Sequence, residues 1–339
     1  MIDLRSDTVT QPTDDMKAAM MAAPLGDDVL GDDPSVKQLE EKIAAISGKD
    51  TAIFVPSGTM ANQIAIWLHT RRGDSVGVEK NAHIFHYEAA APAIFSSVML
   101  RPIEGEAGIM NISSLEEKFL PPDPHFAPMT LVCAEDTANR GGGQYYRTQQ
   151  LHQLCETIHN HKASAHLDGA RAFNAAVASG DPLNVRVSGF DTVSICFSKG
   201  LGAPVGSALC LPAELRDRAI RARKAMGGGM RQSGMMAAAA NYALDRHIER
   251  LHEDHLNAQQ LAEGLKTMGL DVEPCYTNMV YFHHPKAPAL IEKVRAKGVL
   301  ALALTPTRIR MVTHLQVSIT DIARTIDAIH STISELESE

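Results

Sequence analysis

Three groups of polar residues follow apolar runs that are typical of buried strands, and each group could do chemistry. They are Ser57-Gly58-Thr59, Asp168-Gly169-Ala170-Arg171 and Ser198-Lys199-Gly200. The carboxyl ends of parallel strands meet at one edge of an open sheet, and ligands bind along that edge. We therefore expect the three groups to lie close together and to serve one ligand.

Lys199 is the first candidate for covalent chemistry. It follows the apolar run 193–197 and precedes the small-residue loop 200–206, surroundings that a lysine normally avoids. Removal of water makes such an amine nucleophilic towards an aldehyde, as Schiff-base formation requires. An ordinary surface lysine is the alternative, since Ser-Lys-Gly is weak evidence alone. The loop is not a dinucleotide-binding fingerprint, because its glycine spacing is G-x-G-x-x-x-G.

Asp168 supplies the context for Lys199. It places a carboxylate at the end of an apolar strand, and the interval to Lys199 suits one strand–helix–strand step plus a short extra strand. A carboxylate beside a pyridine nitrogen favours the protonated ring, which then withdraws electrons from a carbanion on an attached substrate. The alternative is a structural aspartate that caps a helix.

Ser57-Gly58-Thr59 is suited to binding a phosphate. It opens a predicted helix, so its backbone N–H groups and the Thr59 hydroxyl can donate to phosphate oxygens. It lacks the lysine and the spacing of a nucleotide-binding loop, so we assign the phosphate to a cofactor; a plain helix cap is the alternative. Together with Lys199 and Asp168, this segment predicts pyridoxal 5'-phosphate as the cofactor.

Two arginines are candidates for binding anions. Arg231 follows the glycine turn 227–229 and could reach a phosphate across a subunit boundary. Arg310 is a charge inside an apolar strand and should have a partner. A substrate carboxylate held by two parallel hydrogen bonds would fit, and a structural salt bridge is the alternative.

Fifteen histidines raise the question of a metal site. His252 and His255 do not have the spacing of a zinc protease, and His283-His284 has no clustered partners in the sequence. We expect most of the histidines to be solvated or part of the core.

Apolar runs alternate with helical patterns through the first three quarters of the chain. We expect a helix from about residue 60, another over 149–160, and strands at 52–55, 129–134, 164–167, 192–197 and 207–211. Continuous apolar runs separated by helices are typical of parallel sheets covered on both faces. The prediction is an α/β fold in which a mostly parallel sheet is sandwiched by helices.

A smaller α/β domain is expected at the C-terminal end. After a long helical stretch from 232 towards 268, we expect a strand, a helix, a strand and a terminal helix, at 279–282, 287–297, 310–313 and from 320. The predicted division is 1–247 for the large cofactor-binding domain with an N-terminal arm, and 248–339 for the small domain.

Composition excludes several classes of partner. The chain has 339 residues and a formal net charge of −8, which argues against nucleic acid. The longest uncharged stretch, 51–70, contains Pro56, Ser57, Gly58, Asn62 and Gln63, which argues against a membrane span. No secretory signal is expected at the start. Five scattered cysteines without metal or redox spacing favour a reducing compartment, so we expect a cytoplasmic protein.

The motifs, taken together, closely resemble the low-specificity L-threonine aldolases from Leu4 to the terminal helix. The segments that carry the resemblance are Leu4–Thr10, Gly26–Asp28, Gly31–Pro34, Ser57–Asn62, His166–Arg171, Ser198–Gly206 and Gly227–Gly234. The resemblance implies an aspartate-aminotransferase-type fold (fold type I) with active sites shared between subunits, in a homotetramer built as a dimer of dimers. The implied reaction cleaves L-threonine, L-allo-threonine and related β-hydroxy-α-amino acids to glycine and an aldehyde.

The resemblance also assigns roles to individual residues. Lys199 matches the Schiff-base lysine, Asp168 the partner of the pyridine nitrogen, and His83 the residue stacked on the cofactor ring. The remaining matches are phosphate contacts at Gly58, Thr59 and Arg231, carboxylate contacts at Ser6, Arg171 (also near the cofactor) and Arg310, and a second histidine near the substrate side chain at His125. Thr8 and Thr10 match a structural cation site of some relatives. His83, His125 or a bound water would act as the base on the β-hydroxyl group.

Three positions depart from the family pattern. Members commonly have Asn and His where this chain has Asp136 and Ala138, and a tyrosine where it has Leu30. We expect these changes to affect the substrate pocket and the preference between threo and allo substrates. The competing functions are a β-elimination or transamination that uses the same cofactor, and a protein that binds the cofactor without turnover.

Overall fold

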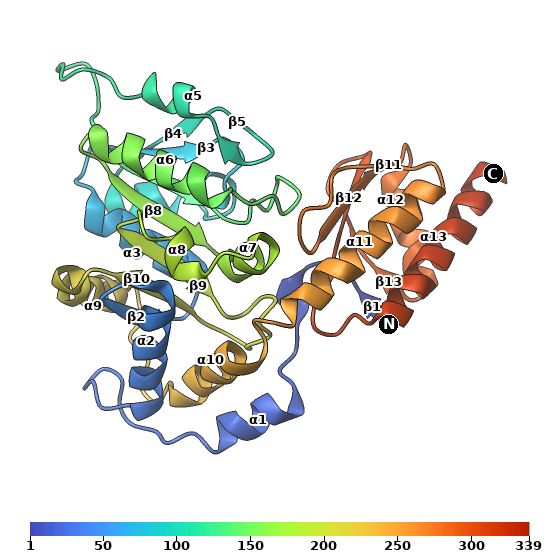
Figure 1. Cartoon of the computed structure of the whole chain (residues 1–339), viewed down its shortest axis with the longest axis horizontal. Helices are drawn as coiled ribbons and strands as arrows, with labels where there is room; N and C mark the ends of the chain where they lie inside the picture. The colour runs from blue at the N-terminus through green and yellow to red at the C-terminus, as the bar shows by residue number, and fades with distance from the viewer. Residues whose placement is uncertain (339) are drawn as a thin grey trace.

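The computed structural model describes residues 1–338, and at its centre lies a seven-stranded sheet (Figure 1). The strand order is β2-β10-β9-β8-β7-β3-β4. The bounds are β2 Thr51–Val55, β3 Ser75–Glu79, β4 Met99–Ile103, β7 Met129–Glu135, β8 Ser164–Gly169, β9 Thr192–Cys196 and β10 Ser207–Leu211. Neighbours pair in parallel, except that β10 is antiparallel to β2 and β9. All strands but β10 therefore end at the same edge.

Helices cover both faces of this sheet. Along β2, Ala52 and Phe54 pack in one core cluster, whereas Ile53 and Val55 pack in another. This alternation buries both faces, and it explains why the strands are continuously apolar. The helices of this part are α1 Asp14–Met21, α2 Pro34–Ser47, α3 Gly58–His69, α4 His83–His86, α5 Ile112–Glu116, α6 Thr148–Asn160, α7 Ala172–Ser179, α8 Leu183–Arg186, α9 Arg216–Ala225 and α10 Gly234–Arg246.

A smaller sheet forms the core of a second body, which lies beside the first in Figure 1. Its order is β11-β12-β15-β14, and all pairs are antiparallel. The elements are α11 Leu251–Thr267, β11 Asp271–Val272, β12 Met279–His283, α12 Ala287–Ala296, β13 Val299–Leu300, β14 Leu302–Ala303, β15 Arg308–Val312 and α13 Ile319–Ser338. The short elements elsewhere are η1 Asp7–Val9, η2 Pro92–Ser96, η3 Ala213–Leu215 and the hairpin β5 Gly105–Glu106 with β6 Ile109–Met110.

The start of the chain packs against this smaller body. Strand β1 (Ile2–Asp3) pairs in parallel with β13, and Ile2 and Leu4 are buried in the same apolar cluster as the smaller sheet. Both termini lie in this part of the molecule in Figure 1. From there the chain continues along the large sheet edge, where Thr10 donates to the carbonyl oxygen of Lys199 at 2.9 Å. We call residues 2–11 the N-terminal strap.

The predicted fold class is confirmed, with two differences in the elements. The helical stretch expected from 232 towards 268 is two helices, α10 and α11, that are interrupted at 247–250. Strands β3 and β4 were not predicted. β3 is bounded by Ser75 and Glu79, and β4 contains Arg101-Pro102, so neither forms a long apolar run. Within residues 1–338, no helix is long and apolar enough to cross a membrane.

Candidate active site

A cavity of about 620 Å³ opens at the carboxyl edge of the large sheet. It is bounded by the ends of β2, β7, β8 and β9, by the N-terminal strap and by the smaller body. Most of the residues singled out from the sequence line it together: Ser6, Thr8, Gly58, Thr59, His83, Asp168, Arg171, Lys199 and Arg310. The expectation that three strand-end groups converge on one site is met.

Lys199 follows β9 and faces this cavity. Its backbone is fixed, because its carbonyl oxygen accepts hydrogen bonds from the Thr10 hydroxyl and from the N–H of Gly202, each at 2.9 Å. Its Nζ forms no hydrogen bond or salt bridge with residues 1–338. A half-buried primary amine with a fixed backbone and a free end suits reaction with an aldehyde.

Asp168 is buried at the end of β8, and its carboxylate is held in one orientation. Oδ2 accepts from Asn62 Nδ2 at 2.9 Å, and Oδ1 accepts from the N–H of Ala170 at 3.2 Å. Asn62 lies on α3, and its Oδ1 in turn accepts from Ser194 Oγ at 2.9 Å. The carboxylate is thereby directed towards the cavity rather than used as a helix cap.

His83 is the first residue of α4, at the end of β3. Its backbone N–H donates to Glu135 Oε2 at 2.7 Å, and its Nδ1 lies 3.0 Å from Glu88 Oε1. Burial alone would lower the pKa of His83, but the hydrogen bond to Glu88 and the charges of Asp168 and Glu88 raise it above its ordinary value.

The N-terminus of α3 lies at this cavity, where the sequence predicts a phosphate cradle. Ser57 is the N-cap, and its Oγ accepts from the N–H of Met60 at 3.2 Å. Gly58 and Thr59 are the first two helical residues, whose N–H groups have no intrahelical acceptor. The buried hydroxyl of Ser207 has no partner among the described residues and would lie 3.7 Å from a Cβ at Gly58. Free donors at a helix N-terminus favour an anion.

Arg171 was predicted to bind a substrate carboxylate, but its main partner is within the chain. Its Nε and Nη2 donate to the two oxygens of Asp7, at 2.7 and 2.6 Å, and both side chains are buried. Although burial opposes ionisation, the charge of Arg171 lowers the pKa of Asp7 to about 2. Arg171 still lines the cavity. Asp7 occupies the Nε–Nη2 face of its guanidinium, which leaves the Nη1–Nη2 face for a carboxylate.

Arg310 lines the same cavity as Arg171. Nη1 donates to Asn139 Oδ1 at 3.1 Å and Nη2 to the carbonyl oxygen of Arg5 at 3.0 Å. Its Nε is buried and has no acceptor within residues 1–338. Both of these acceptors are uncharged, and Arg310 forms no salt bridge with a carboxylate of residues 1–338, so the structural salt bridge considered as the alternative is not found. The guanidinium lines the cavity, where a carboxylate is a suitable partner for it.

Glu135 lines the same cavity and was not predicted. Its oxygens accept from the backbone N–H groups of His83 and Asn139, at 2.7 and 2.9 Å. Burial, followed by the charge of Asp168, raises the pKa of Glu135 to about 7. The sequence carried a signal, because a glutamate ends the apolar run Met129–Ala134 in the same way that Asp168 ends its own strand.

Three predicted residues lie outside the cavity of the single chain. His125 is exposed in the loop after α5 and pairs with Asp123. Arg231 is exposed and pairs with Asp27 at 2.9 Å. Thr10 is buried, and its hydroxyl bonds only to backbone carbonyl oxygens. A role for His125 or Arg231 in a site therefore needs another copy of the chain.

The three departures from the family pattern also lie away from this cavity. Asp136 is turned inwards and forms a buried ion pair with Arg186 at 2.6 Å; burial raises the pKa of Asp136 to about 6 despite that partner. Ala138 is buried, and a Cβ at Gly108 would lie 2.2 Å from its own. Leu30 is exposed. None of the three lines the cavity of a single chain, so their effect on the substrate pocket stays a prediction.

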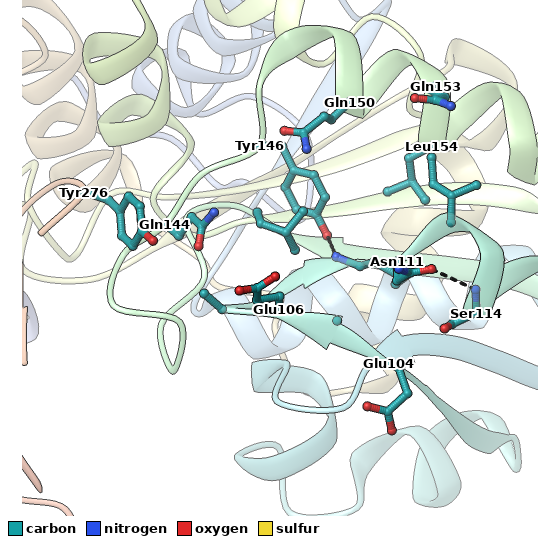
Figure 2. Close-up of a pocket in the computed structure, with 15 residues that line it drawn as sticks. Glu104, Glu106, Asn111, Ser114, Gln144, Tyr146, Gln150, Gln153, Leu154 and Tyr276 are labelled. Atoms are coloured by element: carbon teal, nitrogen blue, oxygen red, sulfur yellow. Dashed lines mark hydrogen bonds between the residues drawn. The ribbon is translucent and has the colours of Figure 1, made fainter. Parts of the chain in front are cut away.

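A second cavity, of about 650 Å³, lies between the β5–β6 hairpin and α6 (Figure 2). Its lining is mostly amides, hydroxyls and carboxylates, and several of these groups are already bonded within the chain. Tyr146 Oη accepts from the N–H of Met110 at 2.8 Å, and Asn111 caps α5 through the N–H of Ser114, as the dashed lines in Figure 2 show. None of the predicted site residues lines this cavity.

The comparisons with known proteins identify the family. The model of the beta-eliminating lyases matches residues 3–286. The low specificity L-threonine aldolase of Escherichia coli K12 is 45% identical over 321 residues, which cover 94% of this chain and 95% of the relative. The chain belongs to the low-specificity L-threonine aldolase family.

Solved structures show the same fold. A threonine aldolase of Leishmania major aligns with a TM-score of 0.84 at 20% identity, covering 98% of this chain and all of the other. A serine palmitoyltransferase of S. paucimobilis that carries a PLP–myriocin adduct aligns with a TM-score of 0.77 at 17% identity, covering 100% of this chain and 88% of that one. Fold type I is thus confirmed.

Pyridoxal phosphate is the cofactor of this enzyme family, and the residues of the cavity fit it. Lys199 offers a free amine for the aldehyde, and Asp168 a fixed carboxylate for the ring nitrogen. The α3 N-terminus offers free backbone donors for the phosphate. His83 offers a ring at the cavity wall.

Proposed function

We propose that this protein is a pyridoxal-phosphate-dependent aldolase. It cleaves the Cα–Cβ bond of L-threonine, L-allo-threonine and related β-hydroxy-α-amino acids, and it releases glycine and an aldehyde. The observation that carries the proposal is that Lys199, Asp168, the α3 N-terminus and Arg310 all line one cavity. Amine, carboxylate, phosphate cradle and carboxylate receptor are the four groups that the reaction requires.

When bound, the cofactor supplies a protonated pyridine ring that accepts the electron pair left at the α-carbon. Lys199 provides the amine that holds the cofactor aldehyde until an amino acid replaces it. Asp168 keeps the ring proton in place, because its orientation is fixed by Asn62 and by the N–H of Ala170. Gly58 and Thr59 bind the phosphate and thereby orient the ring.

The substrate carboxylate is bound by Arg310, with the Ser6 hydroxyl beside it in the cavity wall. Asp7 fixes the guanidinium of Arg171, whose Nη1–Nη2 face is left for the same carboxylate. We assign His83 as the base on the β-hydroxyl group, because it lines the cavity and its Nδ1 is already engaged by Glu88. Its Nε2 is then the atom that takes the proton.

The proposal is tested with a panel of β-hydroxy amino acids in threo and erythro forms, with glycine and aldehyde both measured. We expect equal amounts of the two products and, with Lys199→Ala, no turnover. A keto acid or an exchanged amino group would instead indicate elimination or transamination. A yellow protein that releases no aldehyde from any member of the panel would indicate binding without turnover.

We also propose a division at residues 247 and 248, a cytoplasmic location and a homotetramer whose active sites are shared between subunits. Exposed apolar side chains support the assembly: Phe85, Tyr87, Ile94 and Phe95, of which Tyr87 lines the cavity. The exposed positions of His125, Arg231 and Leu30 support the sharing of active sites, since each residue is exposed where it can reach another subunit.

Five unpaired cysteines support a reducing compartment. A structural cation at Thr8 and Thr10 stays a prediction.

A further inference from the structure

Glu88 is fully buried beside the cavity, and three side-chain donors surround its carboxylate. Oε1 faces His83 Nδ1 at 3.0 Å and Asn62 Nδ2 at 2.9 Å, and Oε2 faces Gln63 Nε2 at 2.5 Å. Asn62 and Gln63 lie on α3, and His83 begins α4. One carboxylate therefore links the helix that cradles the phosphate to the histidine at the cofactor site.

The orientation of the Asn62 amide shows that Glu88 acts as an acceptor. Asn62 Oδ1 is occupied by Ser194 Oγ at 2.9 Å and faces His166 Nε2 at 3.1 Å. Its Nδ2 must then point the other way, where it donates one hydrogen to Glu88 and the other to Asp168. With Asn62 and Gln63 both donating, the hydrogen between Glu88 and His83 has to come from His83 Nδ1.

We propose that Glu88 is a positioning residue that fixes the ring orientation of His83 and places its N–H on Nδ1. This inference rests on the proposed function. It explains why Nε2 of His83 is the nitrogen that takes the proton in that reaction. With Nδ1 carrying the hydrogen, Nε2 presents its lone pair to the cavity. Without Glu88, the imidazole could exchange its tautomers or turn its ring, and the nitrogen that takes the hydroxyl proton would not be defined.

The backbone after Glu88 has an unusual conformation, which indicates that the surrounding structure holds the Glu88 side chain in its buried position. Ala89 and Ala90 have φ values of 51° and 59°, in the left-handed region that residues with a Cβ rarely adopt. Two such residues in succession reverse the chain between α4 and η2. Backbone strain of this kind tends to collect at functional sites, and here it coincides with the turn that directs Glu88 into the protein.

A metal ion is the alternative explanation for this cluster. Ligand atoms of His83, Glu88 and Asp168 lie within 4.8 Å of one another. However, Asn62 Nδ2 lies 2.9 Å from both carboxylates and directs its two hydrogens at them. A cation would have to displace that amide group, which cannot turn over without breaking its bonds to Ser194 and His166.

The charges around His83 come from every side of the cavity. Glu88 follows α4, Asp168 ends β8, Glu135 ends β7, and Lys199 follows β9. Of these four groups, only Glu88 contacts the imidazole directly. Removal of its charge should therefore lower the pKa of His83, whereas the other three groups stay in place.

The wild-type holoenzyme gives the first test, through ¹⁵N and ¹³C NMR of labelled histidines with His83→Asn used for assignment. We expect neutral His83 to carry its hydrogen on Nδ1. A hydrogen on Nε2 would overturn the proposal, and this measurement needs no variant at Glu88.

Glu88→Gln gives the second test, since it keeps the shape of the side chain and removes the charge. We expect the pKa of His83 to fall by about one or more, and the acid limb of kcat/KM to move to lower pH with it. The matched control is Gln63→Leu, which removes the other Glu88 contact on α3 and should not lower the pKa of His83. The same His83 titration in Glu88→Gln and wild type would contradict the proposal.

The two proposals fail in different ways. If the wild-type enzyme releases glycine from no β-hydroxy amino acid, the proposed function is wrong, and the NMR titration still decides the role of Glu88. If the enzyme is active and Glu88→Gln lowers kcat with little change in KM, the carboxylate-binding groups are intact and the loss lies with His83. A raised KM with unchanged kcat would instead assign Glu88 to substrate binding and refute the positioning role.

Discussion

At the scale of single residues, the cavity depends on carboxylates that are held in one orientation by one or two neighbouring residues. Asp168 is the clearest case, because Asn62 and the N–H of Ala170 hold both of its oxygens. Asp168→Asn replaces the carboxylate with a neutral amide, which cannot keep the cofactor ring protonated. We expect kcat to fall by orders of magnitude while cofactor content, measured by visible absorbance, is partly retained. Asp14→Asn, on the surface, is the control, and near-normal turnover by Asp168→Asn would refute the assignment.

Asp7 has a structural role that can be measured separately. In Asp7→Asn the buried Arg171 loses its charged partner, which typically costs about 3–5 kcal/mol. Because the folded pKa of about 2 lies below the ordinary value of 3.8, the contribution of Asp7 is present above pH 4 and is lost as the pH falls towards 2. Urea unfolding at pH 7 and along an acid series checks both statements. Equal unfolding free energies for wild type and variant at pH 7 would contradict them.

These residues also mark what the sequence could and could not predict. Lys199 and Asp168 were predictable, because each follows an apolar strand, and strand ends meet at one edge. Glu88 was not, because it lies in a loop and reaches its partners only through the turn at Ala89 and Ala90. The pairing of Arg171 with Asp7 was missed because it joins residues far apart in the sequence. Charge pairing of this kind has no local pattern.

At the scale of elements, the N-terminus of α3 combines stability with cofactor binding. Ser57→Ala removes the hydrogen bond to the N–H of Met60, so we expect about 1 kcal/mol less stability and weaker cofactor binding. Thr13→Ala removes the same kind of cap from α1, where Thr13 accepts from the N–H of Met16 at 3.2 Å. Both variants should lower the Tm, but only Ser57→Ala should raise the Kd for the cofactor. A raised Kd in both variants would mean that cofactor binding weakens with any loss of stability, and not through the α3 N-terminus in particular.

Elements were predictable where apolar runs are long and buried on both faces, as in β7 and β9. β4 was missed because it lies at the edge of the sheet, where one neighbour is enough and Arg101-Pro102 is tolerated. The break between α10 and α11 was missed because residues 247–250 contain neither proline nor glycine. Tertiary contacts end α10 there, since His247 Nδ1 lies 2.7 Å from the carbonyl oxygen of Leu201.

At the scale of the whole molecule, the exposed position of Arg231 predicts that a complete active site needs two chains. If Arg231 of one subunit binds the phosphate in its neighbour, Lys199→Ala and Arg231→Ala damage different halves of the same site. Random mixing of the two variants in a symmetric pair should then restore about a quarter of the wild-type sites. The measurement is aldolase activity after refolding of the mixture at limiting cofactor. A mixture of Lys199→Ala with Asp168→Asn is the control and should regain nothing, because both residues line the cavity of one chain. No recovery in the first mixture, or a monomer in analytical ultracentrifugation, would show that each chain works alone.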